Sequence, residues 1–387
     1  MSFCRALLAG FLILWCLSVS VSVSVSDDAL LPPCEFPAIY NFGDSNSDTG
    51  GISAAFEPIQ APYGEGFFRK PAGRDSDGRL IIDFIAERLK LPYLSAYLNS
   101  LGANFRHGAN FATGGSTIRK PNETIFEYGI SPFFLDMQIK QFDQFKARTK
   151  DLYNQVNNES SGRDKLPKQE DFAKALYTFD IGQNDLSVGF RKMNFDQLRA
   201  AMPDIVNQLA SAVQNIYQQG GRTFWIHNTG PIGCLPVNRF YNLNPAPGYV
   251  DQFGCVNDQN TMAVEFNRQL KERVIKLRAE LSEAAITYVD VYAAKYGLIS
   301  RTKNLGYADP LKVCCGYHEK YDHVWCGTKA TINKTQVYGG SCKDPSKYVS
   351  WDGVHYTQAA NLWVADLTHS GTLTDPPIPI THACHRQ

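Results

Sequence analysis

Residues 38–51 read AIYNFGDSNSDTGG, an apolar run that passes directly into small polar residues. The simplest interpretation is a buried strand that ends in a turn, because Gly, Asp, Ser and Asn all favour turns. The alternative is that one serine in this turn, Ser45, is placed at the strand end as a nucleophile. The rest of the chain decides between the two.

Strand-like runs alternate with amphipathic helix patterns on either side of this stretch. Strands are predicted at residues 38–42, 175–182, 222–228 and 285–292. Helices are predicted at residues 78–89, 198–216 and 266–281, where apolar residues recur every three or four positions. This alternation predicts one α/β domain, residues 27–387, with a mainly parallel central sheet covered on both faces. Irregular excursions are expected at about 52–80, 115–170 and 300–345, with residues 146–171 forming a surface loop or helix end.

Two predicted strand ends carry residues suited to chemistry. Ser45 follows the strand at 38–42, and Asn184 follows the strand at 175–182. Because ligands of open α/β sheets bind outside the carboxyl ends of the strands, both side chains are expected at the same edge.

Composition excludes some classes of partner. The 387 residues contain 38 Lys plus Arg and 38 Asp plus Glu, and 44% of them are hydrophobic. This balance gives no electrostatic footprint for nucleic acid, so no nucleic-acid partner is expected. The protein is expected to be a monomer.

The first 26 residues have the layout of a secretory signal peptide. Arg5 precedes an apolar run at residues 6–19, and a Ser/Val tract leads to Asp27. An uncleaved anchor is the alternative, but alternating serines make a poor membrane core. No later run is long and apolar enough to span a bilayer, and the polar end THACHRQ fits neither a GPI tail nor an ER-retention signal.

Cysteines and sequons agree with export. Eight cysteines remain after the signal peptide, an even number typical of a disulfide-bonded secreted protein: Cys34, Cys234, Cys255, Cys314, Cys315, Cys326, Cys342 and Cys384. Three sequons, at Asn122, Asn158 and Asn333, are candidate glycosylation sites. The segment CCGYHEKYDHVWC at 314–326 also contains His318 and His323, which raises a zinc alternative. We favour disulfides, because adjacent cysteines do not form a C-x₂-C zinc knuckle.

The remaining residues of an acyl-transfer site are present elsewhere in the chain. A serine nucleophile needs a base that is itself oriented by a third group, and Asp352 and His355 in SWDGVHYT are spaced to share one side of a helical turn. Oxyanion donors are offered by Asn184 in IGQND and by Gly114 or Gly115 in NFATGGST. Individually, each feature is more often a surface histidine, an Asx-turn or a tight turn. Their joint occurrence favours a catalytic site.

These motifs resemble those of the plant GDSL esterase/lipases of the SGNH hydrolase superfamily, in particular its early nodulin-like secreted members. FGDSNSDTGG, NFATGGST, IGQND and WDGVHYT together span residues 42–357, essentially the whole mature chain. The resemblance implies a flavodoxin-like three-layer α/β/α sandwich, a serine mechanism and no metal or organic cofactor. It further assigns the nucleophile to Ser45, the base to His355, the orienting acid to Asp352, and the oxyanion hole to Ser45, Gly114 and Asn184.

The resemblance also implies crossed disulfides in the cysteine-rich segment. The implied pairs are Cys314–Cys326, Cys315–Cys342, Cys234–Cys255 and Cys34–Cys384. Two departures from the family pattern stand beside the site, since Asn46 replaces the Leu of the family's name motif and Tyr356 replaces a frequent Pro. The nucleophile stretch does not match G-x-S-x-G, because Ser47 occupies the second glycine position, so an ordinary α/β-hydrolase elbow is disfavoured. Asp44 and Asp48 are expected to brace the turn.

The leading functional hypothesis is therefore a secreted serine carboxylic-ester hydrolase, extracellular or vacuolar, that acts on acylated small molecules or acylated carbohydrate. An acyltransferase that uses the same residues is the alternative, and a non-catalytic carbohydrate-binding or defence protein is the third hypothesis. Glycosidase activity is not expected, because paired carboxylates cannot be identified from the sequence.

Overall fold

A computed structural model of the chain describes residues 31–122, 129–154 and 162–386. The chain divides into two units, Met1–Pro32 and Pro33–Gln387, and the elements described here belong to the second. The predicted signal peptide, residues 1–26, and the sequon at Asn158 lie outside the described residues and stay predictions.

The central sheet has the strand order β10-β5-β4-β3-β1-β2. Its strands are β1 Ile39–Gly43, β2 Gly108–Asn110, β3 Leu176–Asp180, β4 Thr223–His227, β5 Ala285–Val289 and β10 Thr374–Asp375. Neighbouring strands are parallel except β10, which pairs antiparallel with β5. The order 2-1-3-4-5 is flavodoxin-like and reverses between β1 and β3, the switch point at which such sheets bind ligands.

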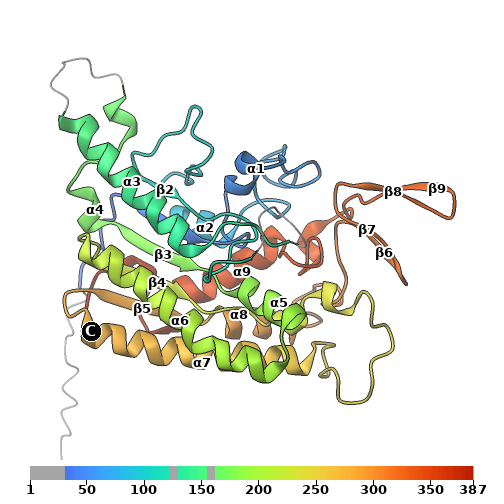
Figure 1. Cartoon of the computed structure of the whole chain (residues 1–387). Coiled ribbons are helices and arrows are strands. Elements are labelled where there is room, and N and C mark those ends of the chain that lie inside the picture. The colour runs from blue at the N-terminus through green and yellow to red at the C-terminus, as the bar shows by residue number, and fades with distance from the viewer. Residues whose placement is uncertain (1–30, 123–128, 155–161, 387) are drawn as a thin grey trace, which may run out of the picture. The chain divides into compact units, whose positions relative to one another are not determined.

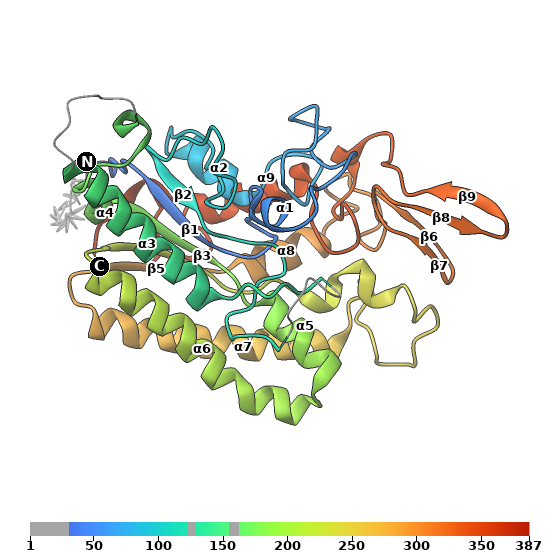
Figure 2. The same ribbon diagram turned by 45° about the horizontal axis from the view of Figure 1, so that its top comes forward.

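Helices cover both faces of this sheet, which gives the predicted three layers (Figure 1). Their bounds are α1 Gly51–Ala55, α2 Ile81–Arg88, α3 Leu135–Asn154, α4 Asp171–Lys174, α5 Gln183–Lys192, α6 Phe195–Gln218, α7 Asn257–Glu280, α8 Val291–Ile299 and α9 Gln358–His369. Short 3₁₀ turns lie at η1 Arg163–Lys165, η2 Ile232–Cys234, η3 Pro236–Arg239, η4 Pro345–Lys347 and η5 Ile380–His382. Figure 2 shows α3, α6 and α7 along one face of the sheet and α2 and α9 on the other.

Alternate residues of the central strands supply the two cores. Tyr40 and Phe42 of β1 point to the layer of α3, α6 and α7 and pack in an aromatic cluster with Phe142. Ile39 points the other way, to the layer of α2, α8 and α9. Because all five β1 residues are buried, the strand reads as a continuous apolar run, as parallel strands covered on both faces do.

The predicted strands and helices are present, although the strand predicted at 285–292 ends at Val289. Several elements were not predicted, among them β2, β10, α3, α5, α8 and α9. The predicted excursion at 115–170 contains the 20-residue helix α3. Its apolar stripe, Leu135, Ile139, Phe142 and Phe145, is buried in the main core. The second half of this helix is polar, so the apolar periodicity is too short to predict a helix of this length. Of the two alternatives for residues 146–154, helix end or surface loop, the structure shows a helix end.

Two short hairpins occupy the predicted excursion at 300–345. They are β6 Tyr317–Glu319 with β7 Asp322–Val324, and β8 Lys329–Ile332 with β9 Thr335–Tyr338. Both lie outside the central sheet and extend together away from it (Figure 1). Among the described residues, no helix combines the length and the apolar character that crossing a membrane requires.

Candidate active site

The turn after β1 is built by its own acidic side chains. The Asp48 carboxylate accepts hydrogen bonds from the N–H groups of Gly50, Gly51 and Ile52 at the start of α1. Asp44 Oδ1 accepts from both the backbone N–H and the side-chain amide of Asn46, each at 2.9 Å. These contacts agree with the expectation that both acids brace the turn, and they fix the backbone on either side of Ser45.

The end of β1 is also held from α3. Gln138, fully buried, accepts a hydrogen bond from Gly43 N–H at 2.9 Å and donates one to the Gly43 carbonyl at 2.7 Å. Gly43 has to be glycine, because a Cβ there would lie 2.3 Å from Ser47 Oγ and 2.6 Å from the Asp180 carbonyl oxygen. Gln138 was not predicted from the sequence, in which its only signal is a polar residue on the apolar stripe of α3.

Ser45, His355 and Asp352 come together in a line of hydrogen bonds. His355 Nε2 lies 2.8 Å from Ser45 Oγ, and His355 Nδ1 lies 2.7 Å from Asp352 Oδ2. Because an ionised carboxylate only accepts, the Nδ1 atom carries the proton toward Asp352. In the neutral imidazole, Nε2 then presents its lone pair to the Ser45 hydroxyl.

The Asp352–His355 segment is a turn, not the helical turn expected from the spacing. Residues 351–355 are bends between Ser350 and Tyr356, which form an isolated antiparallel bridge, and α9 begins only at Gln358. Gly353 has a φ of 98°, a left-handed conformation that interrupts a helix. Instead, Asp352 Oδ1 accepts hydrogen bonds from the N–H groups of Val354 and His355, at 2.9 and 2.8 Å. The carboxylate thus holds the backbone and the imidazole of its partner together.

The charges of this pair shift both pKa values. Burial by itself raises the pKa of Asp352, but the charge and hydrogen bonds of His355 outweigh it and hold that pKa at about 2. Burial lowers the pKa of His355, but Asp352, Asp75 and Asp44 outweigh it and raise that pKa to about 9. The neutral, proton-accepting form of His355 therefore increases as the pH rises toward and past 9.

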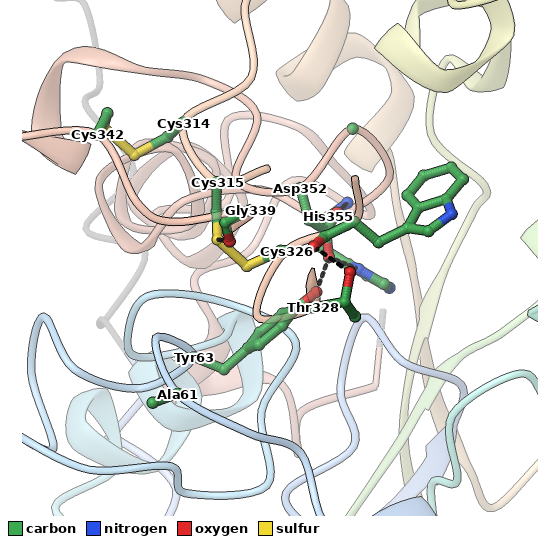
Figure 3. Close-up of a disulfide and its surroundings, with 12 residues drawn as sticks. Ala61, Tyr63, Cys314, Cys315, Cys326, Thr328, Gly339, Cys342, Asp352 and His355 are labelled. Atoms are coloured by element: carbon green, nitrogen blue, oxygen red, sulfur yellow. Dashed lines mark hydrogen bonds and ion pairs between the residues drawn. A yellow bond between two sulfur atoms is a disulfide. The ribbon is translucent and has the colours of Figure 1, made fainter. Parts of the chain in front are cut away.

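Two further residues face this pair and were missed by the sequence analysis. Tyr63 donates its hydroxyl to Asp352 Oδ2 at 2.9 Å, and Figure 3 shows its side chain pointing at that carboxylate. Asp75 places Oδ2 3.9 Å from His355 Nε2. Both lie at 52–80, a segment expected to be irregular, and no motif points to either.

The candidate oxyanion donors are not all free. Gly114 N–H donates to Asp48 Oδ2 at 2.8 Å, so it is engaged in bracing the nucleophile turn. Among the described residues, neither Ser45 N–H nor Gly115 N–H has an acceptor. Asn184 donates its side-chain amide to the Ser116 carbonyl at 2.9 Å and, at the longer distance of 3.4 Å, to Asp44 Oδ2. These contacts hold the amide beside the Gly115 turn. Of the two candidate glycines, Gly115 is therefore the one whose N–H has no acceptor among the described residues.

A buried charged cluster lies behind the nucleophile turn. Lys295 of α8 is 3% exposed, and its Nζ lies 3.4 Å from Asn46 Oδ1 and 4.6 Å from the centre of the Tyr356 ring. Asp180 Oδ2 lies 3.4 Å from His227 Nδ1. Burial and the neighbouring Asp180 raise the pKa of Asp44 to about 7, whereas Lys295 lowers it. Lys295 therefore contacts both positions at which the sequence departs from the family pattern, Asn46 and Tyr356.

All eight cysteines among the described residues are paired, which confirms disulfides but corrects two of the pairs. Cys34–Cys384 and Cys234–Cys255 are as expected, whereas the cysteine-rich segment forms Cys314–Cys342 and Cys315–Cys326. Because successive side chains of an extended segment point to opposite sides, Cys314 and Cys315 bond to different partners (Figure 3), and Cys315 is the one that bonds to Cys326, two residues after β7. His318 and His323, offered as zinc ligands, instead stack on Phe240.

The sequons at Asn122 and Asn333 lie on exposed residues. Asn333 and Lys334, both with positive φ, form the two-residue turn between β8 and β9. Exposure leaves both asparagines accessible, and their glycosylation stays a prediction.

Comparisons with known proteins agree with this arrangement. The family model described as GDSL-like Lipase/Acylhydrolase matches residues 39–368. The chain is 72% identical over 378 residues to GDSL esterase/lipase At5g14450 of Arabidopsis thaliana, covering 98% of this chain and 96% of that protein. It is 48% identical over 356 residues to GDSL esterase/lipase ENOD8 of Medicago truncatula, covering 92% of this chain and 91% of that protein.

Among solved structures, the chain is similar to a catalytic mutant of Axe2, an acetylxylan esterase from Geobacillus stearothermophilus. The identity is 12%, the coverage is 86% of this chain and 92% of that chain, and the TM-score is 0.37, too distant to carry an argument. The family model and the extent of the plant matches are decisive: the chain belongs to the GDSL esterase/lipase family of plants and is a carboxylic ester hydrolase.

Proposed function

We propose that the protein hydrolyses esters through a Ser45–His355–Asp352 triad and is secreted. The line of hydrogen bonds from Ser45 Oγ through His355 to Asp352 is the observation that carries the triad. Secretion rests on the N-terminal sequence, and four disulfides support an oxidising compartment.

The proposed reaction has two halves. His355 Nε2 takes the proton of the Ser45 hydroxyl as its oxygen attacks the ester carbonyl carbon. The N–H groups of Ser45 and Gly115 and the amide of Asn184 stabilise the oxyanion. His355 then protonates the leaving alcohol oxygen, the bond between that oxygen and the acyl carbon breaks, and water releases the acyl group from Ser45 by the same route.

The direct test compares the wild-type protein with Ser45→Ala on a series of aryl esters of increasing acyl length. Loss of the nucleophile is expected to lower kcat by roughly 10⁴- to 10⁶-fold. Ser47→Ala, two residues away in the same turn, is the matched control for the loss of a hydroxyl. Equal, non-zero acyl release by wild type and Ser45→Ala would rule out Ser45 as the nucleophile. If both folded proteins are equally inert, non-catalytic binding becomes the leading hypothesis.

Added polyol acceptors test the acyltransferase alternative in the same assay. If acyl groups pass to the polyol faster than to water, the same acyl-enzyme serves transfer. If only free acid forms at high acceptor concentration, hydrolysis is the reaction.

A further inference from the structure

Asp75 lies in a loop that is fixed by the side chains on either side of it. Arg74, buried, binds both oxygens of Asp83 at 2.9 and 2.6 Å. Ser76 Oγ donates to the Tyr356 carbonyl at 3.0 Å, and Asp77 Oδ1 accepts from Gln358 N–H at 2.7 Å. Because Arg74, Ser76 and Asp77 are all hydrogen-bonded to other segments, Asp75 between them is held at a defined position beside His355.

The Asp75 carboxylate has no protein donor. Its Oδ2 lies 3.9 Å from His355 Nε2, beyond hydrogen-bond distance, and no described residue donates a hydrogen bond to either oxygen. Its side chain is 18% exposed, and its Oδ2 lies beside the Nε2 atom of His355. Burial is the main cause of its raised pKa, about 6, and His355 opposes that effect. A carboxylate so placed has unused acceptor capacity next to the reacting atoms.

The position of Asp75 selects a part of the substrate. His355 Nε2 delivers a proton to the leaving alcohol oxygen, which therefore comes within roughly 3 Å of that nitrogen. Asp75 flanks the same nitrogen, so it faces the alcohol part of the ester and not the acyl chain. A hydroxyl on the carbon adjacent to the one that bears the ester oxygen would reach it, whereas an anionic alcohol part would be repelled.

From this we infer that Asp75 is a specificity-determining residue that accepts a hydrogen bond from a hydroxyl on the carbon adjacent to the one that bears the ester oxygen. The substrate class is therefore an ester of a polyol or sugar. The inference rests on the proposed function, because it uses His355 as the proton donor to the leaving group.

The test uses pairs of acetate esters that differ in one group. 2-Hydroxyethyl acetate and propyl acetate differ by a hydroxyl in place of a methyl, and their ratio of kcat/KM is measured at pH values where activity no longer changes. Asp75→Leu, which cannot accept a hydrogen bond, is expected to lower this ratio about tenfold or more, with Asp75→Asn intermediate. Glu65→Gln, an exposed acid in the same segment, is the control for lost charge and should leave the ratio unchanged.

Two outcomes of the ratio would overturn the inference. An equal fall on both esters would mean that Asp75 acts only through His355. A selective loss on acetylcholine relative to 3,3-dimethylbutyl acetate, with no change in the hydroxyl pair, would mean that Asp75 pairs with a cation instead.

A binding readout separates this inference from the proposed function. Saturation-transfer NMR with methyl β-xyloside is recorded on Ser45→Ala and on Ser45→Ala/Asp75→Leu, neither of which needs to turn over an ester. Loss of the signal in the double variant supports the Asp75 contact even if the Ser45 assay fails. Equal signals, or none in either protein, contradict it even if the Ser45 assay succeeds.

Discussion

At the scale of single residues, motifs and spacing predict the residues whose role follows from the chemistry of the reaction. They do not predict residues whose role depends on the path of a loop. Ser45, His355 and Asp352 could be paired from the sequence, because a serine nucleophile requires a base and an orienting acid. Tyr63 and Asp75 could not, since their roles depend on where an irregular loop passes. Gly114 and Gly115 could not be separated either, because the choice depends on which N–H the Asp48 carboxylate takes.

The raised pKa of His355 predicts alkaline activity. His355 must be neutral to act as the base, so kcat/KM should increase with pH and level off above about 9. Burial lowers the pKa of His355, but Asp352, Asp75 and Asp44 outweigh it and raise that pKa to about 9. Removing the negative charge at Asp75 destabilises the imidazolium, so Asp75→Asn should shift this acid limb to lower pH. A pH profile measured with a neutral aryl ester checks both. An unshifted limb in Asp75→Asn would contradict the electrostatic coupling.

Asp352→Asn should separate orientation from folding. The amide can donate to Nδ1 and favour the wrong tautomer, so we expect kcat to fall by about 10⁴-fold while the fold persists. Thermal unfolding monitored by circular dichroism is the control for folding. If kcat falls by less than about tenfold, Asp352 does not belong to the triad.

For the oxyanion hole, Asn184→Ala is expected to lower kcat by about 10²- to 10³-fold, with little change in KM. The amide acts on charge that develops only in the transition state, so ground-state binding is spared. Steady-state kinetics on one aryl ester measure the split. A rise in KM with an unchanged kcat would assign Asn184 to substrate binding.

At the scale of elements, periodicity predicts the sheet and its helices but not the segments that depend on tertiary contacts. The strands around Ser45 and Asn184 were found because parallel strands are continuous apolar runs. The Asp352–His355 spacing suggested a helix, but Gly353 and the Asp352 carboxylate favour a turn. The cysteine pairs also depend on tertiary contacts. Cys314 and Cys315 lie beside the Asp352 turn, because their N–H groups donate hydrogen bonds to the Ser350 and Trp351 carbonyls.

The contact of α8 with the nucleophile turn predicts a coupled loss of stability. Lys295→Met leaves Asp44 and Asp180 buried with less positive charge, so the free energy of unfolding should fall by about 3–5 kcal/mol. Lys295→Met/Asp180→Asn removes charges of both signs and should cost less than the sum of the two single variants. Urea unfolding at pH 7 of the wild type, the two single variants and the double variant measures the four free energies of this double-mutant cycle. Additive losses would show that the two charges do not interact.

At the scale of the whole molecule, the central sheet places Ser45, after β1, and Asn184, after β3, on either side of the β1/β3 switch point. The disulfide between Cys34 and Cys384 joins residues 350 positions apart, outside that sheet. Replacing both cysteines by serine is expected to lower the free energy of unfolding by about 2–5 kcal/mol, because the unfolded chain regains freedom. Guanidinium unfolding checks this, and unchanged stability after verified loss of the bond would contradict it.

The same bond makes the chain between its two cysteines a covalent ring. A protease that cuts one peptide bond anywhere between Cys34 and Cys384 opens the ring but releases no fragment, so the nicked protein keeps its mass except for one added water. Such a cut would be invisible on a non-reducing gel and would appear only after reduction. New chain ends could likewise be created within an exposed loop while the original ends remain tethered at Cys34–Cys384.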